Sequence, residues 1–272
     1  MMLSPDQIAA FQETLWAYYA KHARNELPWR QPESDGQFDS YKILVSELML
    51  QQTQVSRVVP KFHAFIAIFP TVKTLASVGL GSVLQTWQGL GYNRRAKYLW
   101  QSAQAITKLG RFPDTLTELV GLPGVGKNTA GAILAYAHNQ PIVFIETNIR
   151  TVMIHHFFED AEDIADSSIA DCVAQTLDHE NPREWYWALM DYGSYLKNTA
   201  GNASRRSKHY GKQSAFTGSK RQIRGAVIRT LTVGPHTLSE LEHLIADDRL
   251  GAVLADLIAE GLILEENNKY HL

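Results

Sequence analysis

The sequence predicts an all-α fold, and three observations support this prediction. Apolar residues recur at steps of three and four through most of the first 200 residues, which is the spacing of amphipathic helices. Pairs typical of helix starts, such as Ser4-Pro5 and Pro113-Asp114, precede two of these segments. Hydrophobic residues make up 45% of the 272-residue chain, which is enough to bury a sizeable core.

The overall composition excludes several classes of protein. Cys172 is the only cysteine, so neither an internal disulfide nor a zinc or iron–sulfur site built from cysteines can form. The formal net charge of −2 argues against a protein that coats nucleic acid, but it permits local basic patches. Neither a signal peptide nor a run of 18 apolar residues is present. We therefore expect an intracellular location, cytoplasmic or at a bacterial nucleoid.

The first predicted helix begins at Ser4, whose hydroxyl is suited to cap it, and its apolar face continues through Phe11 and Leu15. Residues 27–30 end this helix, and residues 31–39 read as a polar loop. The next helix is predicted over residues 41–59, where the carboxylate of Glu47 interrupts an apolar run. Such a residue either faces water at the helix edge or is a buried carboxylate whose pKa is raised by desolvation.

Two glycine-containing turns follow. Residues 89–92 join two predicted helices and carry Tyr92, and the basic helix face after them is expected to be solvated. Residues 121–126 join helices predicted over residues 113–120 and 129–136. The second turn is either a plain connection or a phosphate site, because Gly124 and Gly126 leave backbone N–H groups uncovered at a helix N-terminus.

Beyond the second turn, Glu146 precedes a helix predicted over residues 148–156. Within it, His155 and His156 are adjacent and point to different helix faces, which argues against a shared metal ion. Residues 159–166 are acidic and are expected to form a solvated surface. An aromatic-rich helix then ends at residues 191–193.

Three motifs in the chain resemble, in the same order, those of the helix-hairpin-helix DNA glycosylases, which include endonuclease III and the MutY-type adenine glycosylases. They are ELMLQQTQV at residues 47–55, WQGLGY at 87–92 and LPGVGK at 122–127. The resemblance covers roughly residues 5–195 and implies a helix-hairpin-helix glycosylase core that flips a base out of duplex DNA. Its motif around Glu47 matches the adenine enzymes.

The resemblance also implies roles for individual residues. Glu47 would protonate the leaving base in a pocket that includes Arg30 and Leu48, and Glu146, beside Asn148, would stay ionised and face the sugar. The family usually has Asp where Glu146 stands, so the reach of this carboxylate differs by one methylene. The residues implied in DNA binding are Gln51, Gln52, Tyr92 as a wedge, and the hairpin residues Gly124, Gly126, Lys127, Asn128 and Thr129.

Two departures from the family pattern refine the prediction. Strand-cutting relatives carry a nucleophilic Lys two residues after the last hairpin glycine, where this chain has Asn128, so we expect a monofunctional glycosylase without lyase activity. The four cluster cysteines that usually follow residues 191–193 are missing. We expect no cofactor other than a monovalent cation that the hairpin backbone could bind. A basic segment, with Arg205, Arg206 and Lys208, is expected to contact phosphates instead.

The last 50 residues predict a separate winged-helix-like domain. Helices are expected over residues 222–231, from 237 and over 250–260, and a hairpin with Asn-Asn at its turn ends the chain. The third helix carries Asp256 and Glu260 and little positive charge. It is therefore as plausible that this helix packs on protein as that it recognises bases in a DNA groove. The expected domains are a core over 1–203, a basic linker over 204–221 and this domain over 222–272.

Together these features predict a monomeric base excision repair enzyme that hydrolyses the N-glycosidic bond of a flipped, mispaired base in double-stranded DNA. Adenine opposite G or 8-oxoguanine is the favoured target, although we expect no counterpart of the separate domain by which the adenine family reads 8-oxoguanine. One alternative is a uracil, thymine mismatch or other damaged-base glycosylase. The other is a non-catalytic DNA-binding protein, against which a buried Glu47 argues because binding alone does not need it.

Overall fold

The computed structural model describes residues 1–159, 161–211 and 215–272, and it confirms the all-α prediction. The described residues form 14 α-helices and one small three-stranded sheet. The chain divides into two compact units. The first comprises Met1–Ile43, Asp114–Gly121 and Val125–Lys212, and the second comprises Leu44–Pro113, Leu122–Gly124 and Gln213–Leu272. No helix in the described part of the chain is long and apolar enough to cross a membrane.

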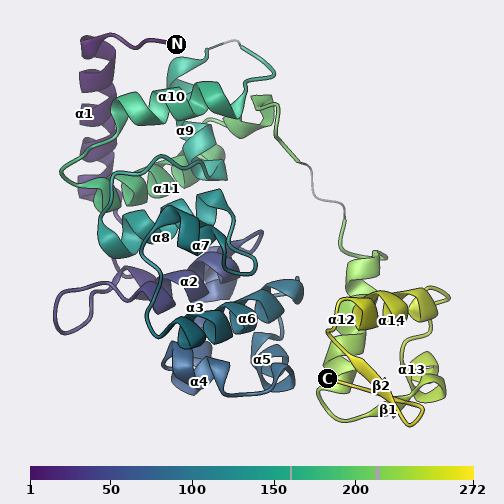
Figure 1. The fold of residues 1–272 in the computed structure, drawn as a ribbon. Coiled ribbons are helices and arrows are strands. Elements are labelled where there is room, and N and C mark those ends of the chain that lie inside the picture. Colours follow the sequence, from purple (N-terminus) through teal and green to yellow (C-terminus); the bar gives the residue numbers. More distant parts are fainter. Residues whose placement is uncertain (160, 212–214) are drawn as a thin grey trace. The chain divides into compact units, whose positions relative to one another are not determined.

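The first unit is built around α11 (Pro182–Thr199), which packs on α1 (Pro5–His22), α8 (Lys127–His138) and α9 (Thr147–Phe157) (Figure 1). Its aromatic residues Trp185 and Tyr186 are fully buried, as the aromatic-rich pattern implies. Gly193 allows α11 to approach α9, because a Cβ there would lie 2.8 Å from the Cβ of Asn148. The unit is completed by α7 (Leu116–Val120), α10 (Asp166–Thr176) and the 3-10 turns Pro28–Arg30 and Ala203–Arg206.

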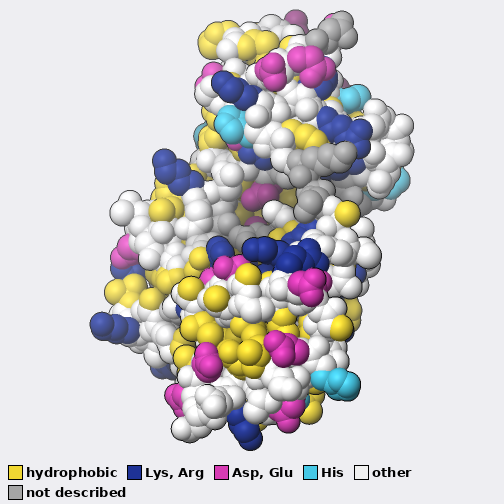
Figure 2. All heavy atoms as spheres, turned by 90° about the vertical axis from the view of Figure 1, so that its right-hand side faces the viewer, with side chains coloured by type: hydrophobic (Ala, Val, Ile, Leu, Met, Phe, Trp, Pro, Cys, Tyr) yellow, Lys and Arg dark blue, Asp and Glu magenta, His cyan; other side chains and the backbone are white. Residues whose placement is uncertain are grey.

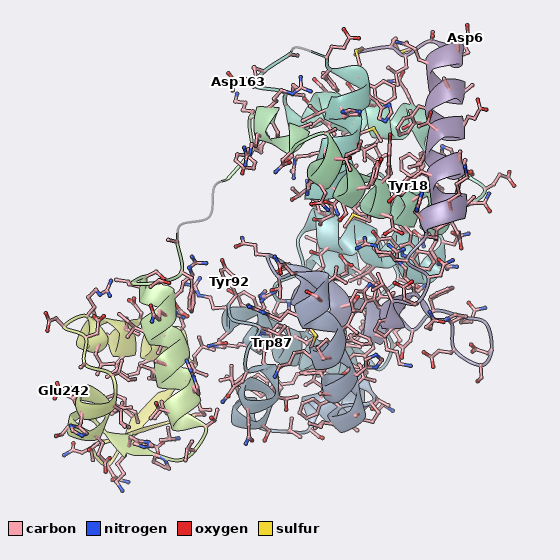
Figure 3. The ribbon with its side chains drawn as sticks, turned by 180° about the vertical axis from the view of Figure 1, so that it is seen from behind. Asp6, Tyr18, Trp87, Tyr92, Asp163 and Glu242 are labelled. Atoms are coloured by element: carbon pink, nitrogen blue, oxygen red, sulfur yellow. The ribbon has the colours of Figure 1, made fainter. Side chains whose placement is uncertain are left out.

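The second unit contains most of α2 (Ser40–Leu50), followed by α3 (Val55–Ile68), α4 (Val72–Ala76), α5 (Leu80–Trp87) and α6 (Arg94–Leu109). The helix α6 packs on α4 and α5, and α3 packs on α5. The indole of Trp87 is fully buried among them (Figure 3).

The prediction of one helix over residues 41–59 is wrong, because the chain leaves the helix after Leu50 and re-enters it at Val55. Between them Gln52 has a φ of 55°, a left-handed conformation that cannot continue a right-handed helix. The predicted start of the helix before the hairpin is also corrected. Thr115 caps α7 by accepting from the Glu118 N–H, so the helix begins at Leu116 rather than at residue 113.

The C-terminal domain has the predicted winged-helix-like order. It contains α12 (Lys220–Leu231), β1 (His236–Thr237), α13 (Leu238–Leu244), α14 (Leu250–Ala259), β2 (Leu264–Glu266) and β3 (Lys269–His271), with sheet order β1-β3-β2. Asn267 and Asn268 form the predicted turn, with φ values of 52° and 62°.

The segment predicted as a basic linker is partly structured. Ala203–Arg206 packs on α9, and Ser207 forms a bridge with Ile164, so this stretch lies in the first unit. Residues 212–214 of the predicted linker lie outside the described residues.

Candidate active site

Glu47 lies one turn before the end of α2, on a helix that is otherwise almost entirely buried. Its neighbours Ser46, Leu48 and Met49 have no exposed surface, whereas Glu47 is half-buried. A carboxylate in this setting is close to apolar side chains and still accessible from one side. This placement suits a proton donor, and the raised pKa expected for Glu47 stays a prediction.

Two turns of the second unit carry the residues predicted to reach DNA. Gln51 and Gln52 lie between α2 and α3, and Tyr92 lies between α5 and α6 (Figure 3). Gln52 and Tyr92 both have left-handed backbones, with φ values of 55° and 48°. Such conformations cost free energy in residues other than glycine and often occur at functional sites. All three residues line one cavity of about 1150 Å³.

Arg95 connects these two turns. Its guanidinium is buried and donates to the carbonyls of Leu48, Met49, Gln51, Leu90 and Gly91 and to the hydroxyl of Thr53. Burial lowers the pKa of Arg95 to about 10, which still leaves it charged at neutral pH. The interpretation of this stretch as a solvated basic face is therefore wrong for Arg95. Sequence reasoning missed its role, although Leu99, Ser102 and Ile106 follow it on the same buried face of α6.

In the first unit, the structure brings Glu146, Asn148 and Lys197 together. Glu146 is the N-cap residue of α9, and Asn148 follows in its first turn. The Asn148 side chain donates to the Met190 carbonyl over 3.1 Å and accepts a hydrogen bond from the Lys197 ammonium. Lys197 belongs to the last turn of α11 and was not predicted as a site residue, because nothing in the local sequence links it to α9.

The electrostatic environment of Glu146 differs from the expectation. Burial raises the pKa of Glu146, and the charges of Arg150 and Lys197 and a hydrogen bond from the Thr147 N–H oppose this effect only in part. The sequence led us to expect a carboxylate that simply stays ionised. The pKa shift has the opposite direction, so the charge on Glu146 depends on the two nearby cations.

The hairpin before α8 has the geometry that its glycines predict. Gly124 has a φ of 75°, and a Cβ on it would lie 2.6 Å from the Cβ of Tyr98, so only glycine fits. Gly126 is the N-cap residue of α8, and Lys127 and Asn128 are exposed beside it.

Two hairpin side chains have structural contacts. Asn128 accepts a hydrogen bond from the Ile145 N–H over 3.3 Å, which connects α8 to the residue before Glu146. Thr129, predicted to contact DNA, is 8% exposed. Its side chain therefore packs inside the unit, and the predicted contact of Thr129 with DNA stays a prediction.

The two residues assigned to the base pocket are both buried. Arg30 is buried and forms two 2.8 Å hydrogen bonds with the carboxylate of Asp191, to which Arg24 also donates. Leu48 is fully buried in the core. The ion pair holds Arg30 and core packing holds Leu48, and their predicted place in the base pocket stays a prediction.

The basic segment is divided by the structure. Arg206 donates to the carbonyls of Phe158, Glu159 and Ile154 at the end of α9, so its guanidinium closes that helix end. Arg206 is half-buried, and its predicted contact with phosphates stays a prediction. Arg205 and Lys208 are exposed, and their predicted contact with phosphates stays a prediction. Among the described residues there is no cluster of three or more His, Cys, Asp or Glu side chains that could hold a metal ion.

Comparisons with known proteins give matches to a family, to relatives and to solved structures. The HhH-GPD superfamily of base excision DNA repair proteins matches residues 45–172. The adenine DNA glycosylase of Mycolicibacterium smegmatis is 30% identical over 291 residues, covering 97% of this chain and 93% of the relative. That of Buchnera aphidicola subsp. Baizongia pistaciae is 34% identical over 192 residues, covering 68% of this chain and 52% of the relative.

The chain thus spans about half the length of the Buchnera relative and nearly all of the mycobacterial one. Among solved structures, a non-covalent complex of endonuclease III with DNA matches with a TM-score of 0.60 at 18% identity. The match covers 73% of this chain and 89% of that chain. At this identity the likeness concerns the fold.

Proposed function

The chain belongs to the adenine DNA glycosylase family within the HhH-GPD superfamily of base excision DNA repair proteins, and from this we propose that it hydrolyses the N-glycosidic bond of mispaired adenine in duplex DNA. The observation that carries the proposal is the setting of Glu47. It is a partly accessible carboxylate on a buried helix, one turn before the strained turn with Gln51 and Gln52. A binding protein would gain nothing from desolvating a carboxylate there.

The reaction needs a proton on the leaving base and negative charge near the sugar as it acquires oxocarbenium character. Glu47 supplies the proton to the purine, because a carboxyl group close to apolar side chains favours its protonated form. Glu146 supplies the negative charge at the sugar, and water then attacks the anomeric carbon. Two carboxyl groups in different environments can divide these roles.

The chain provides the means to keep Glu146 charged. Lys197 and Arg150 lower its pKa against the effect of burial, and the N-terminus of the 11-residue α9 favours an anion at this position. Lys197 also orients Asn148 through its side-chain oxygen. In this mechanism Lys197 is a positioning residue for Glu146 and Asn148.

The proposed enzyme releases the base without cutting the strand and without an iron–sulfur cluster. Asn128 occupies the position of the family's lyase lysine, and an amide cannot form a Schiff base. Cys172, the only cysteine of the sequence, is buried in α10. A four-cysteine cluster therefore has no ligands in this chain.

A single-turnover assay on end-labelled duplexes tests the proposal. The panel contains A opposite 8-oxoguanine, A opposite G, U opposite G and T opposite G, each read with and without alkali. We expect cleavage of the adenine strand only after alkali, and loss of this cleavage in Glu47→Gln with DNA binding retained. Base release by Glu47→Gln at the wild-type rate would refute the assignment of Glu47, and release of U or T alone would refute the substrate.

A further inference from the structure

The cavity beside Tyr92 is strongly cationic. Its lining includes seven Lys or Arg side chains and two carboxylates, those of Asp256 and Glu260. The cations are Arg57, Lys61, Arg94, Arg95, Arg221, Arg224 and Arg229. They come from α3, from the start of α6 and from α12 of the C-terminal domain, all within the second unit. Figure 2 shows Lys and Arg side chains gathered across the middle of one face of the molecule.

The two carboxylates neutralise only part of this charge. Glu260 pairs with Arg94 over 2.9 Å and also with Arg224. In contrast, Arg57, Lys61 and Arg229 form no ion pair within the described residues. These three side chains line the same cavity without a carboxylate partner among the described residues, and such a surface attracts a polyanion.

Within the C-terminal domain the charge lies on α12 and not on α14. The helix α12 contains Lys220, Arg221, Arg224 and Arg229 and no acidic residue. The helix α14, which stands where a winged helix usually reads a groove, contains no Lys or Arg, and its exposed positions include Ala252, Ala255 and Ile258. Of these two helices, only α12 therefore offers basic side chains for phosphate contacts.

Arg221, one of the cations that line the cavity, contacts Tyr92. Its Nη1 donates to the Tyr92 hydroxyl over 2.7 Å, and Nη2 donates to the Ala215 carbonyl over 3.3 Å. The guanidinium carbons of Arg221 and Arg95 lie 5.6 Å and 5.3 Å from the centre of the Tyr92 ring. Tyr92, already in a left-handed backbone conformation, is thus held between a buried arginine of the core and an arginine of the C-terminal domain.

We propose that α12 is the DNA-binding helix of the C-terminal domain. Arg221 and Arg229, together with Arg57 and Lys61, bind the phosphodiester backbone of duplex DNA, and Arg221 also holds Tyr92 in position to enter the base stack. This inference rests on the proposed function only in taking DNA as the substrate. A Tyr92 side chain that is fixed before DNA binds loses less conformational freedom on insertion.

The salt dependence of binding tests the phosphate contacts. In the double variant Arg221→Gln/Arg229→Gln, the slope of log K against log salt should fall by about two, since each phosphate contact contributes roughly 0.9. At 0.1 M salt the dissociation constant should rise on the order of 10- to 100-fold by the same relation. The matched control is Lys73→Gln/Lys108→Gln, which removes two exposed charges outside the cavity. An unchanged slope in the first variant would overturn the inference, as would an equal change in the control.

The link to Tyr92 is tested by the rate of base release at saturating enzyme. Arg221→Lys keeps the charge but not the planar fork, so it should keep the salt slope and release the base roughly tenfold more slowly. Tyr92→Phe and Arg221→Gln should together slow release less than the product of their separate effects. Multiplicative effects would overturn the coupling. If the wild type bound duplex with the expected slope but released no base, the proposed function would fail while this inference stood.

Discussion

Replacement of Lys197 by Met tests whether this lysine sets the charge of Glu146. The Lys197 ammonium donates to the Asn148 side chain and lowers the pKa of Glu146. The substitution keeps the length of the side chain and removes one charged hydrogen bond, which is worth about 1.5–3 kcal/mol. Because 1.4 kcal/mol corresponds to a factor of ten in rate, base release at pH 7 should be roughly 10- to 150-fold slower.

The pH dependence separates this role from a merely structural one. Without Lys197 the pKa of Glu146 rises further, so a smaller fraction of the carboxylate is ionised at any given acidic pH. The acid limb of the rate profile should move to higher pH, and the deficit should shrink as the pH increases. In the wild type, burial lowers the pKa of Lys197 itself. The wild-type rate should therefore fall at alkaline pH through loss of this charge, and the variant should lack that limb.

The assay is single-turnover base release from a duplex with A opposite G, measured from pH 5 to pH 10. Lys197→Arg keeps the charge and should recover part of the activity and the acid limb. Lys21→Met, an exposed lysine on α1, is the matched control and should behave as the wild type. A rate lowered by the same factor at every pH in Lys197→Met, or an unchanged profile, would refute the reasoning.

Three further substitutions test the scaffold. Arg95→Met leaves several buried carbonyls without a donor and should lower the free energy of unfolding by about 3–5 kcal/mol in urea titrations, whereas Arg94→Met, its exposed neighbour, should cost less than about 1 kcal/mol. Gly124→Ala places a Cβ in a clash at positive φ, so it should lower the free energy of unfolding by about 2 kcal/mol and weaken DNA binding. Gly126→Ala has open space around the new Cβ and should change neither quantity. Burial raises the pKa of Asp191, but its two arginine partners lower it further, so the net shift is downward. The free energy of unfolding that this carboxylate contributes should therefore be lost as the pH falls below about 4. Asp191→Asn should lack this contribution already at neutral pH.

Helical periodicity was sufficient to predict most elements of the fold. The Ser4 cap, the hairpin glycines and the Asn-Asn turn each depend on local chemistry, and the structure contains all three. The break after Leu50 was not predictable in this way. The residues around Gln52 include neither Gly nor Pro, and a left-handed glutamine is imposed by contacts from elsewhere, including the hydrogen bonds of Arg95 to the carbonyls around it.

The site was predicted less completely, because exposure cannot be read from residue type. Arg30 and Arg206 could belong to a DNA-binding surface by composition, yet both are engaged by protein acceptors. Leu48 is adjacent to Glu47 in sequence and faces the core. Lys197 had no local signal at all, since its role arises only where α11 packs on α9. The sequence of α6 could have identified Arg95 as buried, because Leu99, Ser102 and Ile106 follow it at steps of four, three and four on one helix face.

The distribution of carboxylates explains how a chain of net charge −2 can present cations to DNA. Three carboxylates each engage two basic side chains, and the pairs are Arg24 and Arg30 at Asp191, Arg150 and His209 at Asp166, and Arg94 and Arg224 at Glu260. In each group the carboxylate offsets part of the positive charge and holds the basic side chains by ion pairs. Arg57 and Arg229 have no such partner in the described structure, so their charge is available to an external anion. Position relative to carboxylates, rather than the number of arginines, therefore decides which basic residues of this protein can act on DNA.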